Sequence, residues 1–315
     1  MNLRMRTRVL IGSLVIAVVC AACTSDAARP VAAEDNSPSP RRSPTQNNAQ
    51  EDKKVSLLRG GRKIFPRYRV VAHYGAAATD ELGVLGERPP NKAAQALVRR
   101  AKTYRGFGRP VMPAMELIAT VAQGAAGADG DYSVGSTDKE VKPYLRAVRR
   151  IDGLLILDIQ PGQNGFLPEV KAYEKFLKEP EVGLALDPEW SMHRGAKPAE
   201  QIGWMNARVV NRVSSYLARI VAEHDLPQKL LVIHQFTSQM VRQGGHIKPR
   251  KGLAITFHID GFGGRAAKLS KYRALKMKKP FFNGFKLFLD EDVDMFSPRE
   301  VMRKLKPKPD LLTYQ

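Results

Sequence analysis

The stretch GLALDPEW, residues 183–190, is an apolar run that ends in an acid, a proline, a second acid and a tryptophan. Successive side chains of a β-strand point to opposite faces. One face of the expected strand holds Gly183, Ala185, Asp187 and Glu189, and the other face is aliphatic. A strand of an α/β barrel has this pattern, because its aliphatic face packs against helices while its carboxyl end opens into a site.

Similar runs recur along the chain, and this repetition predicts the fold. Strand-like runs lie at 69–74, 111–117, 154–160, 182–189, 230–235, 253–260, 285–290 and 310–315. Helical patterns lie at 92–104, 139–150, 169–178, 197–224 and 298–305. Alternating strands and helices form right-handed βαβ units with a parallel sheet. We therefore expect a (β/α)8 TIM-type barrel over residues 55–315, about 260 residues long. An open doubly wound sheet is the alternative.

Three features do not fit a complete barrel. The connection between the fifth and sixth strands is short and contains Gly244 and Gly245, so its helix must be small or absent. Pro113 falls inside the second strand, where a missing N–H normally disfavours a central position. The eighth strand runs to Gln315, so the predicted barrel lacks a helix after strand eight. Residues 55–65 are the candidate to cover this gap.

Residues 1–23 resemble a lipoprotein signal peptide. Three arginines precede an apolar run at 9–19 that is too short to span a bilayer comfortably. Ala21 and Ala22 precede Cys23, which we expect to carry the lipid anchor. Residues 24–54 are rich in Pro, Ser and Asn and predict a disordered tether. The sequence thus predicts a protein anchored on the outer face of the cell membrane, or secreted if the lipidation site is not used.

The charge balance indicates anionic surroundings. The 51 basic residues outnumber the 31 acidic ones, for a net charge of +20. A membrane surface or an anionic wall polymer would suit this charge. Nucleic acid is not favoured, because the densest basic cluster, 268–279, lacks interleaved aromatic residues. No cofactor is expected, since GFGG at 261–264 lacks the spacing of a phosphate-binding loop and is interpreted as a tight turn.

Polar side chains gather at the carboxyl ends of the expected strands, on the face that points into the barrel. Buried carboxylates are costly unless they are paired, so this clustering predicts a functional site. The expected catalytic residues are Glu189, Asp187, Asp290 and Asp158. The expected substrate-binding residues are Tyr74, Glu116, Gln160, Trp190, His234, His258, Asp260, Lys286 and Gln315. His73 is expected to be packed outside the site with its ring nitrogens satisfied.

Paired carboxylates between aromatic side chains are typical of glycoside hydrolysis. One acid must be protonated to supply the leaving oxygen with a proton, and the other must be ionised. Crowding by Asp158 would raise the pKa of Asp187 or Glu189. Polysaccharide or cell-wall glycan is the expected substrate.

Seven motifs together resemble the glycosidase-like α/β-barrel lipoproteins of high-GC Gram-positive bacteria, a family with no assigned reaction. They are VAHYG, LDIQPG, LDPEW, IHQF, HIDGFGG, GFKLFLDED and DLLTYQ, spread over 69–315. In the wider group of glycosidase barrels, the proton donor follows strand four and the nucleophile follows strand seven. The resemblance therefore implies Glu189 or Asp187 as the donor and Asp290 as its partner.

Two other functions fit parts of the pattern. A metal-dependent amidohydrolase would use His234 and His258 as ligands, but it also requires a His-x-His on strand one, where this chain has Ala72-His73-Tyr74. No metal site is therefore expected. A non-catalytic barrel that binds polysaccharide is the second alternative, because the same polar groups can hold sugar hydroxyls.

Overall fold

Eight parallel strands close into a barrel, which confirms the predicted TIM-type fold. The computed structural model describes residues 54–77 and 79–315. In chain order the strands are β1 (Arg69–Ala76), β2 (Val111–Ala122), β4 (Leu154–Ile159), β5 (Val182–Leu186), β7 (Lys229–Gln235), β9 (Leu253–Ile259), β10 (Phe282–Leu287) and β11 (Leu311–Tyr314). They pair in sequence order, and β1 closes the barrel by pairing with both β11 and β2.

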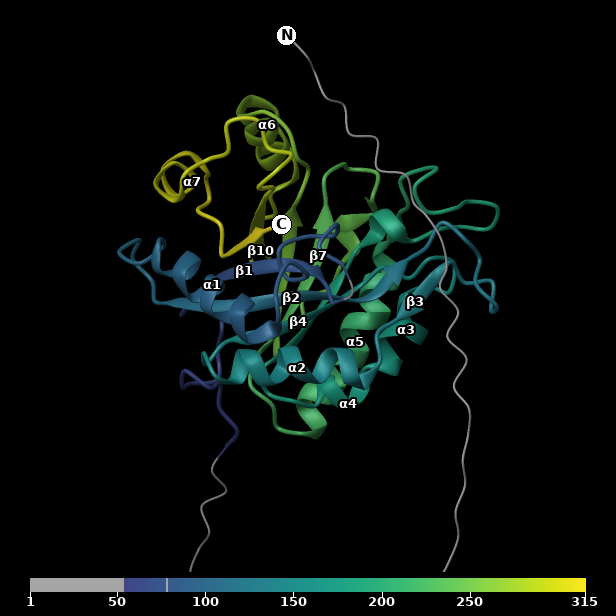
Figure 1. The fold of residues 1–315 in the computed structure, drawn as a ribbon, viewed down its shortest axis with the longest axis horizontal. Helices are drawn as coiled ribbons and strands as arrows, with labels where there is room; N and C mark the ends of the chain where they lie inside the picture. The colour runs from purple at the N-terminus through teal and green to yellow at the C-terminus, as the bar shows by residue number, and fades with distance from the viewer. Residues whose placement is uncertain (1–53, 78) are drawn as a thin grey trace, which may run out of the picture. The chain divides into compact units, whose positions relative to one another are not determined.

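Helices lie around the strands (Figure 1). They are α1 (Pro90–Lys102), α2 (Asp138–Arg149), α3 (Phe166–Ala172), α4 (Glu174–Leu177), α5 (Ala207–Glu223), α6 (Arg265–Leu275) and α7 (Pro298–Lys304). Helix α7 begins with a capping box, in which Ser297 and Glu300 each bond the other's backbone N–H. Helix α6 was not predicted. Its buried residues are Lys268 and Tyr272, so its sequence lacks an apolar stripe.

Short elements complete the loops. Strand β3 (Ser133–Gly135) pairs antiparallel with β2, and β6 (Met205–Asn206) pairs with β8 (Val241–Arg242). The connection from β7 to β9 holds β8 and the 3₁₀ turn η2 (Gly244–His246) but no α-helix, as expected from its length and its two glycines.

Pro113 lies within β2 without interrupting the barrel. It pairs with Val71 of β1, whereas the ladder between β2 and β4 begins one residue later, at Ala114 and Leu154. The missing N–H of Pro113 therefore removes no bond from the β4 ladder. Pro113 is therefore compatible with the central position of β2 in the barrel.

The segment before β1 covers the amino-terminal end of the barrel, whereas residues 55–65 were predicted to take the place of the missing helix after strand eight. Leu57, Ile64 and Phe65 are buried and pack with side chains from the first halves of the barrel strands. The Phe65 ring lies 4.9 Å from the ring of Phe282 at the start of β10. This segment thus closes the end of the barrel that lies away from the site.

The predicted signal peptide, the predicted lipid anchor at Cys23 and the predicted tether up to residue 53 fall outside the described residues. Residues 54–315, with position 78 excepted, contain no helix long and apolar enough to cross a membrane.

Candidate functional site

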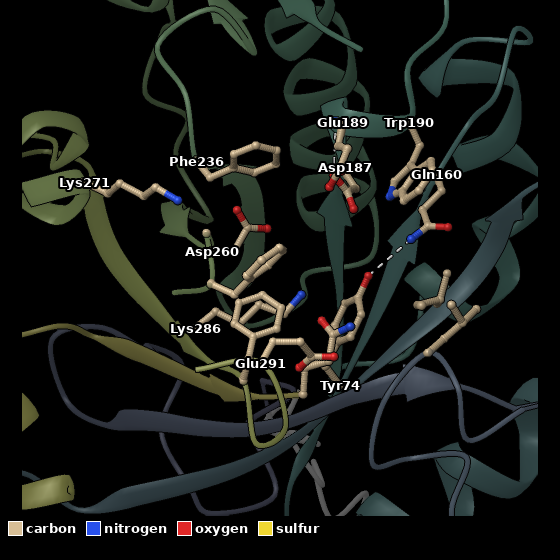
Figure 2. Close-up of a pocket in the computed structure, with 16 residues that line it drawn as sticks. Tyr74, Gln160, Asp187, Glu189, Trp190, Phe236, Asp260, Lys271, Lys286 and Glu291 are labelled. Carbon is tan, nitrogen blue, oxygen red and sulfur yellow. Dashed lines mark hydrogen bonds between the residues drawn. The ribbon is translucent and has the colours of Figure 1, made fainter. Parts of the chain in front are cut away.

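A pocket of about 330 Å³ lies at the carboxyl ends of the barrel strands (Figure 2). This is the end of a TIM barrel where active sites are built. Four carboxylates line the pocket: Asp187, Glu189, Asp260 and Glu291. Its aromatic lining consists of Tyr74, Trp190, Phe236, Phe262 and Phe288. Lys271, Lys286, Gln160 and Gln315 add polar groups.

Asp187 and Glu189 lie together at the end of β5, but not on one strand face as predicted. The strand ends at Leu186, and Pro188–Trp190 forms a 3₁₀ turn, η1. Pro188 starts this turn because its fixed φ suits the first helical position. The Asp187 carboxylate accepts a hydrogen bond from the Glu189 backbone N–H at 3.2 Å. The turn therefore brings both acids to the same part of the pocket (Figure 2).

Both of these carboxyl groups hold their protons unusually tightly. Burial raises the pKa of Asp187 well above its usual value, and the nearby acids Asp158 and Glu189 raise it further. Burial and the charge of Asp260 raise the pKa of Glu189 to about 7. Neither acid forms an ion pair with an Arg or Lys of the described residues. These groups can therefore act as proton donors near neutral pH.

Asp260, at the end of β9, is held in the opposite protonation state, without its proton. His234 Nδ1 lies 2.7 Å from Asp260 Oδ2, and His234 Nε2 lies 3.0 Å from Glu116 Oε1. Burial alone would raise the pKa of Asp260, but the hydrogen bond and charge of His234 lower it. The second oxygen, Asp260 Oδ1, has no hydrogen-bond partner among the described residues. Asp260 is thus an ionised carboxylate whose second oxygen has no partner among the described residues.

His234 is fully buried between the two carboxylates. Burial alone would lower its pKa, but Asp158, Asp260 and Glu116 raise it well above the usual value. Burial would likewise raise the pKa of Glu116, yet the bond to His234 brings it to about 2. Both ring nitrogens therefore donate, and His234 is an imidazolium. Thr313 of β11 donates to Glu116 Oε2 at 2.9 Å and completes this network.

Asp158 lies beneath the pocket rather than on its lining. The Tyr74 hydroxyl donates to Asp158 Oδ2 at 2.8 Å. Gln160 Nε2 donates to the Tyr74 hydroxyl at 3.3 Å (Figure 2). Burial raises the pKa of Asp158. Lys286 Nζ lies 3.5 Å from the centre of the Tyr74 ring. Asp158 therefore positions Tyr74 from below the pocket.

His258 is also fully buried and does not line the pocket. Burial lowers its pKa to about 3, so the ring is neutral. Its ring stands edge to face against His234, with centroids 5.3 Å apart. A Cβ at Gly284 of β10 would lie only 2.1 Å from His258 Nδ1, so this glycine makes room for the ring.

Asp290 falls outside the pocket. Strand β10 ends at Leu287, so the expected alternation does not reach Asp290, which is exposed in the following loop. Asp292 of that loop is buried in an ion pair with Lys268 of α6 at 2.8 Å. Glu291 lines the pocket instead. Of the predicted catalytic residues, the structure therefore brings Asp187 and Glu189 into the pocket, places Asp158 below it and leaves Asp290 out.

The predicted substrate-binding residues divide in the same way. Those that line the pocket are Tyr74, Gln160, Trp190, Asp260, Lys286 and Gln315, whereas Glu116, His234 and His258 form the buried layer below. Lys271, Glu291 and Thr313 were not predicted. Lys271 lies on α6, which has no apolar stripe to reveal it. Thr313 shares the alternation of Gln315 on the last strand, and that signal could have identified it.

No metal centre is formed by the described residues. Among residues 54–77 and 79–315, no group of three or more His, Cys, Asp and Glu side chains is arranged to hold a metal ion. His234, a ligand in the amidohydrolase alternative, has both ring nitrogens bonded to carboxylates.

No family model and no curated protein matches this chain. Among solved structures, it is similar to the β-glucuronidase of Parabacteroides merdae with glycerol in its active site, at 9% identity and a TM-score of 0.34. That match covers 77% of this chain and 32% of the β-glucuronidase, so this chain spans about a third of its length. A second similar structure is the dihydropteroate synthase of Xanthomonas albilineans with 4-aminobenzoic acid, at 11% identity and a TM-score of 0.33, covering 79% and 88%.

Proposed function

We propose that this barrel is a glycoside hydrolase-like enzyme that cleaves a polysaccharide in its carboxyl-end pocket. The observation that carries the proposal is the contrast between carboxyl groups within one pocket. Asp187 and Glu189 have raised pKa values, whereas His234 keeps Asp260 ionised. Titratable neighbours whose pKa values are driven apart are the mark of an acid and base pair.

The roles follow from these protonation states. Glu189, or Asp187 below it, donates the proton to the departing glycosidic oxygen. Asp260 presents its unpaired oxygen either to the sugar carbon or to a water molecule. The Glu116–His234 pair positions Asp260 and prevents its protonation. Asp260 thus takes the role that the resemblance implies for Asp290.

The walls of the pocket suit a sugar ring. Carbohydrate rings have an apolar face that packs on aromatic side chains, while their hydroxyls need polar partners. Phe262 is 61% exposed and stands edge to face against Phe288, with centroids 5.8 Å apart. Gln160 and Lys286 supply polar groups beside these aromatic rings.

The cellular setting in this proposal comes from the sequence. The signal-like residues 1–23 and Cys23 support export and anchoring through a lipid, and the net charge of +20 supports a position near anionic wall material. The proposed substrate is therefore a cell-envelope or environmental polysaccharide. Membership of the glycosidase-like lipoprotein family is part of the same proposal and rests on the seven motifs.

The test measures binding and product formation separately. The protein and its Glu189→Gln variant are incubated with wall polysaccharide fragments, while Glu200→Gln, an exposed acid outside the pocket, serves as the matched control. We expect Glu189→Gln to bind fragments but to form product about 10²–10⁴-fold more slowly. Binding without product from the unaltered protein would instead support a polysaccharide-binding protein.

A further inference from the structure

A second hollow, of about 380 Å³, lies on the helix-facing side of β1. His73 enters it from β1, Arg99 and Arg100 from α1, and Arg88 from the loop between them. Tyr74, the next residue after His73, points into the barrel pocket instead. The two cavities therefore lie on opposite faces of the same strand, as the alternation of side chains requires.

The lining of this hollow is strongly cationic. Three guanidinium groups face one carboxylate, Glu87, which pairs with Arg88 at 2.6 Å on the exposed surface. Such exposed pairs contribute little to stability. Arg99 and Arg100 form no ion pair within residues 54–77 and 79–315, although Arg100 also packs over the Tyr314 ring at 4.3 Å. Two positive charges without an acidic partner in the described residues thus line the hollow.

His73 is the second observation that indicates a ligand. Its side chain is only 7% exposed, yet Nε2 has no hydrogen-bond partner among the described residues, contrary to the expectation of a satisfied ring. Burial, together with the nearby charges of Arg100 and Arg88, lowers the pKa of His73 to about 3. The neutral His73 ring carries one N–H group. Because a buried polar atom without a hydrogen-bond partner costs free energy, a ligand that bonds to Nε2 would stabilise this arrangement.

We infer that His73, Arg88, Arg99 and Arg100 form a binding site for a phosphate group. Guanidinium groups match phosphate oxygens with paired, charge-assisted hydrogen bonds. Several oxygens on one phosphate can accept bonds from three separate segments at once. Val84, Ala96 and Leu289 add apolar lining, which leaves room for an organic group attached to the phosphate.

The site lies beside the barrel pocket but does not depend on its function. The loop after β10 places Leu289 in this hollow, while Phe288 and Glu291 line the barrel pocket. The loop after β1 likewise places Val84 in this hollow and Leu82 in the barrel pocket. Phosphate binding can be measured without turnover, so the inference stands or fails separately from the proposed hydrolase.

The test is a calorimetric titration of the full-length protein at constant ionic strength. The probes are inorganic phosphate, glycerol 1-phosphate and acetate. We expect one saturable phosphate site that Arg99→Gln weakens about tenfold, the loss of one charge-assisted hydrogen bond. The matched control is Arg273→Gln, which removes one exposed charge from α6, and it should bind as the unaltered protein does.

The outcomes separate a phosphate site from general attraction by a cationic protein. Tighter binding of glycerol 1-phosphate identifies an ester as the ligand, and equal binding identifies free phosphate. At a phosphate concentration near the dissociation constant of Arg273→Gln, the His73 ring signals should shift in NMR spectra of Arg273→Gln and shift far less in those of Arg99→Gln. The inference is overturned if neither phosphate probe saturates, if acetate binds equally well, or if Arg99→Gln binds like Arg273→Gln.

Discussion

Glu189 and Asp260 carry the same functional group, and their surroundings give them opposite protonation states. Glu189 lies on a turn where burial and a neighbouring acid favour the neutral form. Asp260 lies 2.7 Å from an imidazolium that favours the ionised form. The sequence supplied both carboxylates, but it could not reveal which one His234 contacts, because that contact joins residues on β7 and β9.

The proposed roles predict how activity depends on pH. Glu189 must be protonated, and its pKa is about 7. Product formation should therefore be constant below neutrality and fall about tenfold per pH unit above pH 7. The pH–rate profile measures this directly. A falling limb at much higher pH would assign the donor role to Asp187, and a rate that rises through pH 7 would contradict both assignments.

The same pKa makes a prediction about stability. The pKa of Glu189 rises from its ordinary value of 4.5, which applies to the unfolded chain, to about 7 in the folded protein. This raised pKa contributes stability that is fully present below pH 4.5 and is lost as the pH rises through 7. Glu189→Gln should therefore gain stability relative to the unaltered protein between pH 4 and pH 8, by up to about 3 kcal/mol.

Urea unfolding at the two pH values measures this gain, and the exposed Glu200→Gln variant is the control. A stability difference between Glu189→Gln and the unaltered protein that does not change with pH would show that the pKa of Glu189 is not raised.

Inside the barrel, contacts between charged side chains connect different strands. His234 of β7 contacts Glu116 of β2 and Asp260 at the end of β9. Gly284 of β10 leaves the space that the neighbouring His258 ring fills. This layer supports the pocket from below and keeps Asp260 oriented.

Removing the His234 imidazolium should lower the free energy of unfolding. His234→Gln leaves the buried Glu116 carboxylate without its cationic partner, and loss of one member of a buried ion pair costs about 3–5 kcal/mol. Urea unfolding near pH 7 should show this loss. His246→Gln, which alters an exposed histidine of η2, should unfold like the unaltered protein. A His234→Gln variant of unchanged stability would contradict the buried network.

Strand number and order could be predicted from the sequence, because aliphatic runs with turn signals recur eight times. Element ends could not. The turn at Pro188 ends β5 at Leu186, and β10 ends at Leu287, three residues before Asp290. In both places, the alternation continues in the sequence after the backbone has left the strand. Helix α6 was missed because it buries a lysine and a tyrosine rather than an apolar stripe.

In the whole molecule, the two ends of the barrel differ in structure and in role. The carboxyl end holds the pocket, and the segment before β1 closes the other end with Phe65, which is 1% exposed. Phe65→Ala should cost about 3–5 kcal/mol, because it leaves a cavity in the barrel interior. Chemical unfolding measures this, with Leu58→Ala, at 44% exposure, as the near-neutral control. Equal stability of the two variants would show that this end is not closed by packing.

The proposed hydrolysis depends on the acid at the end of β9 and not on the exposed acid after β10. The most direct measurement is the rate at which Asp260→Asn and Asp290→Asn release new reducing ends from a polysaccharide that the unaltered protein cleaves. We expect a loss of about 10²–10⁴-fold for Asp260→Asn and an unchanged rate for Asp290→Asn. The opposite pattern, or cleavage by Asp260→Asn at the full rate, would contradict it.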